Sequence, residues 1–236
     1  MCGIVGGTNP DWDYQGAVKV LHHRGPDSQE TRSFQKLTLG FTRLAVIDTR
    51  DVANQPMSSI DGNVWITYNG EIYGFLQLRD QLIGLGWEFR TESDTEVVLT
   101  SYLQWGERFV EHLDGMFAIA IYDRRDESLR LYRDRFGIKP LFYYWDGRDF
   151  GFASEIKGIQ GFLRGSCGEI DPTAAYDFLT YHYIPTPKTL FKKIRKLPPA
   201  SKVVFDVEKR RLGGVTSYWN LADVFSKPFS GSVDEA

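Results

Sequence analysis

The chain has 236 residues, of which 42% are hydrophobic and 25% charged, and its formal net charge is -3 at pH 7. This is an ordinary globular composition, and the weak negative charge gives no electrostatic reason to expect nucleic acid or an anionic membrane as a partner. No apolar run approaches the roughly 18 residues of a membrane span, no secretory signal precedes the first motif, and two cysteines make no disulfide framework. These features favour a protein of the reducing cytoplasm.

Apolar periodicity predicts paired strands with helices between them. Strands are expected over residues 37–41, 64–68, 116–122, 129–132, 141–145 and 150–153. Helices are expected over residues 14–21, 98–105, 155–162 and 173–183. This arrangement argues for an α+β fold with antiparallel sheets rather than a parallel βαβ array. From Asn220 onward the chain is polar and loses periodicity, so residues 220–236 are predicted to be a linker or tail.

The chemistry begins at Cys2, because loss of Met1 would place a free α-amine on the residue that carries the thiol. An α-amine has a reference pKa of about 7.7–8.0 and can act as a base near neutral pH. The thiol, with a reference pKa of about 8.5, needs only a modest shift to attack as a thiolate. One residue would then supply both nucleophile and base. The alternative is that Cys2 stands there by chance or as a small buried apolar group.

The start of the chain, Met1-Cys2-Gly3-Ile4-Val5-Gly6, resembles that of the class II glutamine amidotransferases, which use an N-terminal nucleophile. Further motifs of this family match in the same order, namely Arg24-Gly25-Pro26-Asp27, Arg43-Leu44-Ala45-Val46-Ile47-Asp48, Tyr68-Asn69-Gly70-Glu71-Ile72-Tyr73, Ser93-Asp94-Thr95-Glu96-Val97, Asp114-Gly115-Met116-Phe117-Ala118, residues 133–141, Ala153-Ser154-Glu155 and Leu197-Pro198-Pro199. The set covers roughly residues 1–219. It is similar to the glutaminase domain of glutamine-dependent asparagine synthetases, and Arg24 to Asp27 is the motif that separates these from sugar-phosphate and phosphoribosylamine relatives.

The resemblance implies a four-layer αββα sandwich of the N-terminal-nucleophile hydrolase type, with two antiparallel sheets between helical layers. It implies a glutaminase domain over residues 1–219, followed by a linker or tail over residues 220–236 toward a synthetase domain that is not in this chain. The Ser-Gly-Gly-x-Asp-Ser phosphate loop of such a domain does not occur in the sequence. ATP and Mg are therefore expected only in that missing domain, and no cofactor or metal is expected here.

The resemblance also assigns residues to the substrate glutamine. Arg43 is similar to the family arginine that grips the α-carboxylate, a task that suits a planar guanidinium. Its alternative role is a structural ion pair. Leu44, Ala45, Val46 and Ile47 are expected to form the adjoining wall of the substrate site, and a core strand is an equally good interpretation of this run.

Asn69 and Gly70 resemble the oxyanion hole of the family, in which a side-chain amide and a backbone N–H point at one oxygen. Asn-Gly is also a common tight-turn dipeptide. Glu71 and Asp94 are expected to hold the α-ammonium of glutamine. Asp94 lies in the run from Ser93 to Glu96, which has the form of a helix capping box, and the two roles are compatible.

Other conspicuous residues are predicted to carry no ligand. Residues 135–140 lack the spaced glycines and the Lys-Ser/Thr end of a phosphate loop, so they are interpreted as a turn between strands that, in the family, supports the interface with the synthetase domain. The basic run 188–196 is interpreted as a solvated face or a domain contact. Cys167 is expected to be a spare loop thiol, and His22 and His23 are expected to end the first helix.

The predicted activity is hydrolysis of glutamine to glutamate and ammonia through a glutamyl thioester on Cys2. The ammonia would pass to an asparagine-forming synthetase domain in cis or in trans, and a homodimer is compatible with this interpretation. One alternative is a glutaminase domain that amidates another acceptor, such as a sugar acid. Another is a non-catalytic interaction domain of the same fold, which would require loss of Cys2, Arg43, Asn69 or Asp94, and all four are present.

Overall fold

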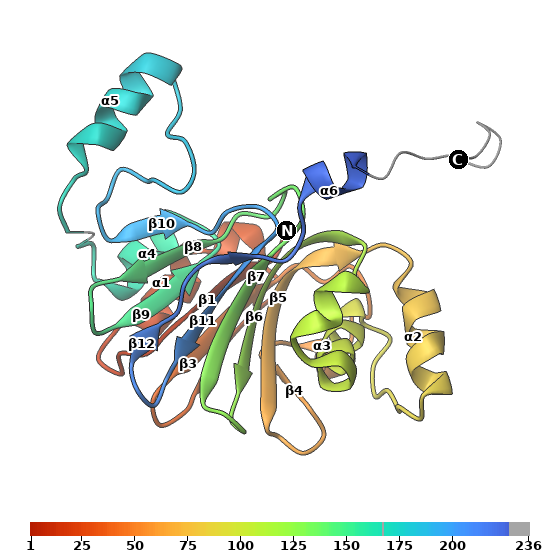
Figure 1. The fold of residues 1–236 in the computed structure, drawn as a ribbon. Helices are drawn as coiled ribbons and strands as arrows, with labels where there is room; N and C mark the ends of the chain where they lie inside the picture. Colours follow the sequence, from red (N-terminus) through yellow and green to blue (C-terminus); the bar gives the residue numbers. More distant parts are fainter. Residues whose placement is uncertain (167, 227–236) are drawn as a thin grey trace.

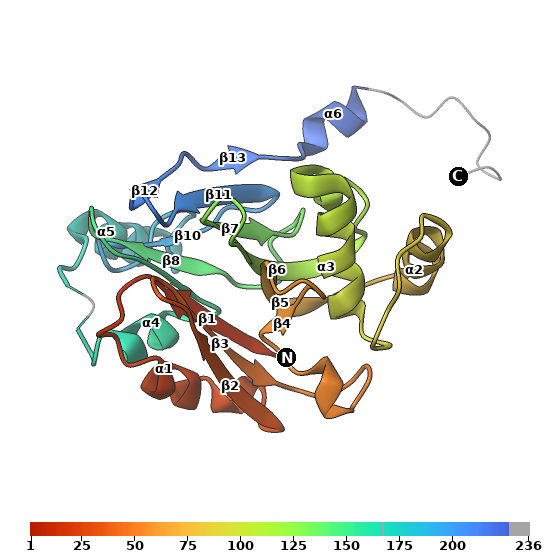
Figure 2. The ribbon, with the colours of Figure 1, turned by 90° about the horizontal axis from the view of Figure 1, so that it is seen from below.

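The structure, a computed structural model, describes residues 1–166 and 168–226, and two antiparallel sheets lie face to face at its centre (Figures 1 and 2). The first sheet has the strand order β10 (Ile194–Lys196), β8 (Phe142–Trp145), β9 (Phe150–Ala153), β1 (Gly3–Gly7), β3 (Thr38–Arg43) and β2 (Ser28–Ser33). The second has the order β12 (Arg211–Leu212), β11 (Ser201–Asp206), β7 (Ser128–Arg133), β6 (Gly115–Asp123), β5 (Val64–Ile72) and β4 (Met57–Ser58), with β13 (Thr216–Ser217) paired to β11.

Helices cover the outer face of each sheet (Figure 2). The first sheet is covered by α1 (Tyr14–Val20) and α4 (Ile156–Phe162), and the second by α3 (Asp94–Trp105) with α2 (Phe75–Gly84) beside it. Two more helices, α5 (Pro172–Tyr181) and α6 (Leu221–Phe225), lie outside this stack (Figure 1). Single 3₁₀ turns span His22–Arg24, Asp51–Ala53 and Gly106–Glu111.

Three apolar clusters fill the spaces between these four layers. The cluster between the sheets contains Ala118 and Ala120 of β6, while Ile119 and Ile121 of the same strand belong to the cluster under α3. Successive side chains of a strand point to opposite faces, so β6 is buried on both sides and reads as a continuous apolar run. A third cluster joins α1 and α4 to the first sheet. The predicted αββα sandwich is therefore confirmed.

All the predicted strands and helices are present, and the predicted strand pairs 116–122 with 129–132 and 141–145 with 150–153 are β6–β7 and β8–β9. The apolar pattern predicts no strand at β1, β2, β4, β10, β11, β12 or β13. The sequence of β1 is rich in glycine because its neighbours approach closely, since a Cβ on Gly6 would lie 2.6 Å from the Phe152 ring. The sequence of β2 is polar and the strand lies at the sheet edge, so it shows no apolar alternation.

One local prediction and one alternative interpretation are wrong. His22 and His23 do not end the first helix, because α1 ends at Val20 and the histidines belong to a following 3₁₀ turn. Residues 44–47 are not a core strand, because β3 ends at Arg43 and Val46 is 72% exposed. Within residues 1–166 and 168–226, no helix is long and apolar enough to cross a membrane. Cys167 and most of the predicted tail, from residue 227 on, lie outside the described residues.

Candidate active site

A cavity of about 240 Å³ brings together residues that are far apart in the sequence. Its lining includes Cys2 ahead of β1, Arg43 at the end of β3, Asn69, Gly70 and Glu71 in β5, and Asp94 at the start of α3. Leu44, Val46 and Ile47 line it as well. Ala45 of the predicted set does not line the cavity, and its N–H donates to Asp27 Oδ2 at 2.7 Å, which fixes the course of this segment.

Cys2 is half-buried and held from both sides. The backbone N–H of Leu44 donates to Cys2 Sγ at 3.4 Å, and Sγ lies 3.7 Å from the carbonyl oxygen of Leu44. Arg24 Nε donates to the carbonyl of Cys2 at 2.9 Å, while Arg24 Nη1 pairs with Glu155 at 2.7 Å. Burial raises the pKa of the Cys2 thiol, and the Leu44 hydrogen bond, the terminal ammonium and Arg43 act in the opposite direction.

Asn69 and Gly70 lie inside β5, which continues to Ile72, so the tight-turn interpretation of this dipeptide is wrong. Asn69 is 1% exposed, and its Nδ2 has no hydrogen-bond partner among the described residues. A buried amide without a partner carries the full cost of its desolvation. Because Asn69 lines the cavity, this donor is available to a molecule bound there.

The backbone N–H of Gly70 points away from the centre of the sheet. Gly70 lies opposite Phe117 in the β5–β6 register, and both backbone groups of Phe117 bond to Asp134 on the far side of β6. Gly70 and Phe117 therefore form a pair without mutual hydrogen bonds, and the Gly70 N–H faces the cavity edge of β5. A side chain does not fit at this residue, because a Cβ would lie 2.4 Å from the carbonyl oxygen of Met116.

The guanidinium of Arg43 is buried and bonds only to neutral oxygens of the described residues. It donates to the carbonyl of Arg50 at 3.0 Å, to Asn54 Oδ1 at 2.6 Å and to the carbonyl of Asp48. The structural ion pair that was the alternative for Arg43 is absent from the part of the chain that the structure describes. A buried charge of this kind calls for an anionic partner, which a bound carboxylate would supply.

Asp94 is a buried carboxylate at the first turn of α3. Its Oδ2 accepts from Tyr68 Oη at 2.8 Å and from the N–H of Ile72 at 3.3 Å. Burial raises the pKa of Asp94 against the lowering effect of the Tyr68 hydrogen bond. Glu71 is exposed and stands at the rim of the same cavity.

The capping box predicted ahead of α3 is only half formed. Ser93 Oγ accepts from the N–H of Thr95 at 3.0 Å, as an N-cap does. Glu96, however, accepts from the N–H groups of Arg90 and Thr91 rather than from that of Ser93. The loop before α3 therefore folds back onto Glu96, and Asp94 is left to face the cavity.

Several lining residues were not predicted from the sequence, and Gln55 and Lys139 are the two whose contacts bear on the site. Gln55 acts as a strand partner for Tyr68, because its Oε1 accepts from the Tyr68 N–H at 2.6 Å and its Nε2 donates to the Tyr68 carbonyl at 3.2 Å. A lone glutamine in a loop gives no sequence signal for this role. Lys139 is buried and lines the cavity, although residues 135–140 were interpreted as an interface turn. No cluster of three or more potential metal ligands occurs among the described residues.

The chain belongs to the glutamine amidotransferase domain family, whose model matches residues 1–219. The predicted enzyme class is thereby confirmed. Among curated relatives, glutamine-hydrolyzing asparagine synthetase 1 of Bacillus subtilis is 37% identical over 211 residues, which cover 86% of this chain and 33% of the relative. A putative asparagine synthetase of Methanocaldococcus jannaschii is 34% identical over 224 residues, 87% of this chain and 43% of the relative.

The chain thus spans less than half the length of these relatives. Among solved structures, the glutamine phosphoribosylpyrophosphate amidotransferase of Bacillus subtilis matches with a TM-score of 0.64 at 20% identity, over 91% of this chain and 48% of the other. This likeness shows the shared fold. The similarity to glutamine-hydrolysing asparagine synthetases that the motifs predicted is confirmed by the named relatives, while the individual roles of the site residues stay predictions.

Proposed function

We propose that this chain hydrolyses the side-chain amide of glutamine with Cys2 as the nucleophile. The observation that carries the proposal is the unpartnered Nδ2 of Asn69, which lines the same cavity as the Cys2 thiol. A buried donor without a protein partner is what an oxyanion hole requires before the oxyanion forms, because the donor then needs no rearrangement.

In the proposed cycle, the Cys2 thiolate attacks the amide carbon of glutamine and a tetrahedral intermediate forms. Asn69 Nδ2 and the N–H of Gly70 donate to its oxyanion. The carbon–nitrogen bond then breaks, and the α-amine of Cys2 passes a proton to the departing ammonia. Water cleaves the resulting γ-glutamyl thioester, so one glutamine and one water give one glutamate and one ammonia.

The charged groups of the cavity suit the zwitterionic end of glutamine. Arg43 would bind the α-carboxylate, since its guanidinium has no acidic partner among the described residues. Asp94 and Glu71 would hold the α-ammonium, one from within the cavity and one from its rim. Leu44, Val46 and Ile47 would form the adjoining wall. Charge-assisted hydrogen bonds of this kind contribute about 1.5 to 3 kcal/mol each.

The mechanism requires removal of Met1. In the structure Met1 is 59% exposed and lines the same cavity, so it occupies space next to the thiol. Its loss would open this space and turn the backbone nitrogen of Cys2 into a free amine. That amine would lie within the residue that carries the nucleophile, where it can exchange protons with the reacting atoms.

The ammonia acceptor is proposed from the relatives, which are named asparagine synthetases and extend far beyond the matched region. We infer that residues 1–219 form the glutaminase domain and that residues 220–236 lead toward a synthetase domain, in cis or in trans, which would bind ATP and Mg. No cofactor is proposed for the chain itself, and the cytoplasm is the proposed compartment. Amidation of a sugar acid is not favoured, since these relatives are named for asparagine.

The test combines intact mass with a glutaminase assay on the wild type, Cys2→Ala and Cys2→Ser. We expect the wild type to lack Met1 and to release glutamate and ammonia in equal amounts, and both variants to be inactive while folding normally. A processed wild-type chain that releases no glutamate, or a Cys2→Ala variant that retains activity, would show that the proposal is wrong for this chain.

A further inference from the structure

Lys139 is a buried lysine that the mechanism above does not use. It is 6% exposed and lines the cavity that holds Cys2. Its ammonium makes no hydrogen bond or ion pair within residues 1–166 and 168–226. Lysines are rarely buried, and the Lys139 ammonium, which is not among the fully enclosed atoms without a partner, opens to the cavity.

The loop that carries Lys139 is fixed by a buried carboxylate. Asp134 is 1% exposed and accepts from the N–H groups of Phe136 at 3.1 Å, Ile138 at 2.9 Å and Lys139 at 3.0 Å. Arg133 Nε donates to the carbonyl of Lys139 at 2.8 Å. Both backbone groups of Lys139 are therefore bonded, and the loop holds this residue at the cavity wall.

The charges of the cavity lining can be matched with those of bound glutamine to see what remains for the Lys139 ammonium. Apart from the terminal α-amine, the side chains of the lining include two cations, Arg43 and Lys139, and two carboxylates, Glu71 and Asp94. In the proposed substrate complex, the α-carboxylate of glutamine takes Arg43 and its α-ammonium takes the two acids. Lys139 is then the cation of the lining that no substrate charge occupies.

Lys139 lies in the lining of the same cavity as Cys2, and both belong to one set of interacting charges. Burial and the neighbouring Arg24 lower the pKa of Lys139, while the charges of Glu71, Asp134 and Cys2 raise it. Arg24 in turn holds the carbonyl of Cys2. Lys139 therefore shares its electrostatic environment with the nucleophile and with the residue that anchors it.

We propose that the Lys139 ammonium stabilises the Cys2 thiolate against the two carboxylates of the cavity, so that Lys139 is a positioning residue that acts through Cys2. This inference rests on the proposed function. The charged and titratable groups around Cys2 and Lys139 are the Met1 α-amine or, after its removal, that of Cys2, together with Arg24, Arg43, Tyr68, Glu71, Asp94 and Asp134. Removing Lys139 leaves the carboxylates less compensated, which disfavours a further negative charge on sulfur.

The test measures the rate of Cys2 alkylation by iodoacetamide against pH, in a Cys167→Ser background that leaves Cys2 as the single thiol. Lys139→Met removes the charge at similar volume, Lys139→Gln is a second neutral variant, and Lys139→Arg restores a cation. Lys196→Met is the matched control, because burial also lowers the pKa of Lys196, whose ammonium bonds to the Ile184 carbonyl and does not line the cavity.

We expect the alkylation midpoint to move up by about half a pH unit or more in Lys139→Met and Lys139→Gln, as Coulomb's law gives for loss of a nearby charge at the dielectric of a partly buried site. Lys139→Arg and Lys196→Met should match the wild type. An unchanged midpoint in the neutral Lys139 variants, or an equal movement in Lys196→Met, would overturn the inference.

A parallel pH profile of glutaminase kcat/KM separates this inference from the proposed function. If the wild type hydrolyses glutamine but the alkylation midpoint stays fixed in the neutral variants, the role of Lys139 is wrong and the glutaminase proposal stands. If the midpoint moves while the wild type hydrolyses no glutamine, Lys139 does act on Cys2 and the glutaminase proposal fails.

Discussion

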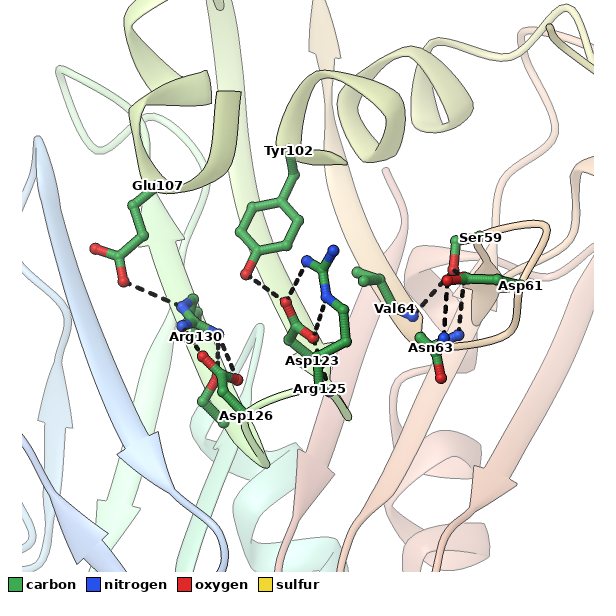
Figure 3. Close-up of polar contacts among 11 residues, drawn as sticks. Ser59, Asp61, Asn63, Val64, Tyr102, Glu107, Asp123, Arg125, Asp126 and Arg130 are labelled. Carbon is green, nitrogen blue, oxygen red and sulfur yellow. Dashed lines mark hydrogen bonds and ion pairs between the residues drawn. The ribbon is translucent and has the colours of Figure 1, made fainter. Parts of the chain in front are cut away.

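The end of the second sheet that lies away from the cavity, here called the far end, is where β6 turns into β7. Charged side chains pair with one another there (Figure 3). Asp123 accepts from Tyr102 Oη at 2.9 Å and from Arg125 Nη2 at 2.6 Å. Arg130 pairs with Asp126 and with Glu107. The β4–β5 turn beside them is closed by hydrogen bonds from Ser59 and Asn63 to Asp61.

The cavity end of the same sheet is arranged in the opposite way. Asn69 Nδ2 has no partner, Lys139 has no acid, and Arg43 bonds to neutral oxygens, all within the described residues. The β5–β6 register sets the two ends apart, since Val64 pairs with Asp123 at one end and Ile72 with Gly115 at the other.

The difference separates polar groups that stabilise the fold from those left free for a ligand. A paired buried group contributes about 0.5 to 1.5 kcal/mol, whereas an unpaired one costs about 1 to 3 kcal/mol. Natural proteins keep such costs mainly at functional sites. Substitutions at the far end should therefore change stability, and substitutions at the cavity end should change catalysis.

The largest effect is expected for Asn69→Ala. Loss of one oxyanion donor typically lowers kcat by about 100- to 1000-fold, and KM should change little because the amide acts on the intermediate. The midpoint temperature of thermal unfolding should not be lowered, since no protein hydrogen bond of Nδ2 is lost. Asn63→Ala is the matched control at the far end and should keep full kcat. Equal losses of kcat in both variants would contradict the comparison.

Arg43→Met is expected to raise KM for glutamine by about 10- to 100-fold, which corresponds to loss of a charge-assisted contact to the α-carboxylate. The sharper measurement uses 4-aminobutanamide, which is glutamine without that carboxylate. The wild type should lose most of its kcat/KM on this substrate, and Arg43→Met should lose little further. If the variant discriminates between the two amides as strongly as the wild type does, Arg43 does not bind the carboxylate.

Asp123→Asn should lower the free energy of unfolding by about 1 to 2 kcal/mol, measured by urea denaturation, because it weakens a buried charge-assisted network. Burial opposes ionisation of Asp123, yet the hydrogen bonds from Arg125 and Tyr102 outweigh it and hold the pKa of Asp123 below its usual value. The kcat per folded molecule should stay at the wild-type level. A lowered kcat with unchanged stability would break the proposed division between the two ends.

The smallest effect concerns Glu155, which pairs with Arg24 behind Cys2. Burial raises the pKa of Glu155, but hydrogen bonds from Arg24, His23 and Lys157 lower it more, to about 2. Because the folded pKa lies below the unfolded value of about 4.3, this stabilisation is complete above about pH 5 and is lost as pH falls toward 2.

Urea denaturation should therefore show that Glu155→Gln lowers the free energy of unfolding by about 1 kcal/mol at pH 7, as expected for a partly exposed ion pair. Repeated at lower pH, the measurement should show that the difference in unfolding free energy between wild type and variant disappears toward pH 2. A difference in unfolding free energy that stays constant over this pH range would show that ionisation of Glu155 does not contribute to stability.

The sequence predicted those site residues that lie within a recognisable family motif. Cys2, Arg43, Asn69 and Asp94 come from four separate segments, and the fold places all four in one cavity. A continuous apolar run likewise predicted β6, because that strand is buried on both faces. The contacts of a residue could not be predicted from the sequence where they depend on the course of a loop. Lys139 faces the cavity only because the preceding turn folds around Asp134.

Strand edges posed a similar limit. Gln55 bonds to the backbone of Tyr68 just ahead of the start of β4, and this pairing can be recognised only once β4 and β5 are aligned. Neither β1 nor β2 shows the apolar alternation of a strand. The sequence of β2 is polar because the strand is exposed, and that of β1 is rich in glycine because its neighbours pack closely against it.

Cys2 is expected to form a covalent glutamyl intermediate during turnover. The most direct measurement is mass spectrometry of the wild-type chain quenched during turnover of glutamine, followed by peptide mapping. We expect a γ-glutamyl thioester on Cys2 that is absent from Cys2→Ala. Steady release of glutamate with no adduct on the chain, or an adduct on a different residue, would contradict it.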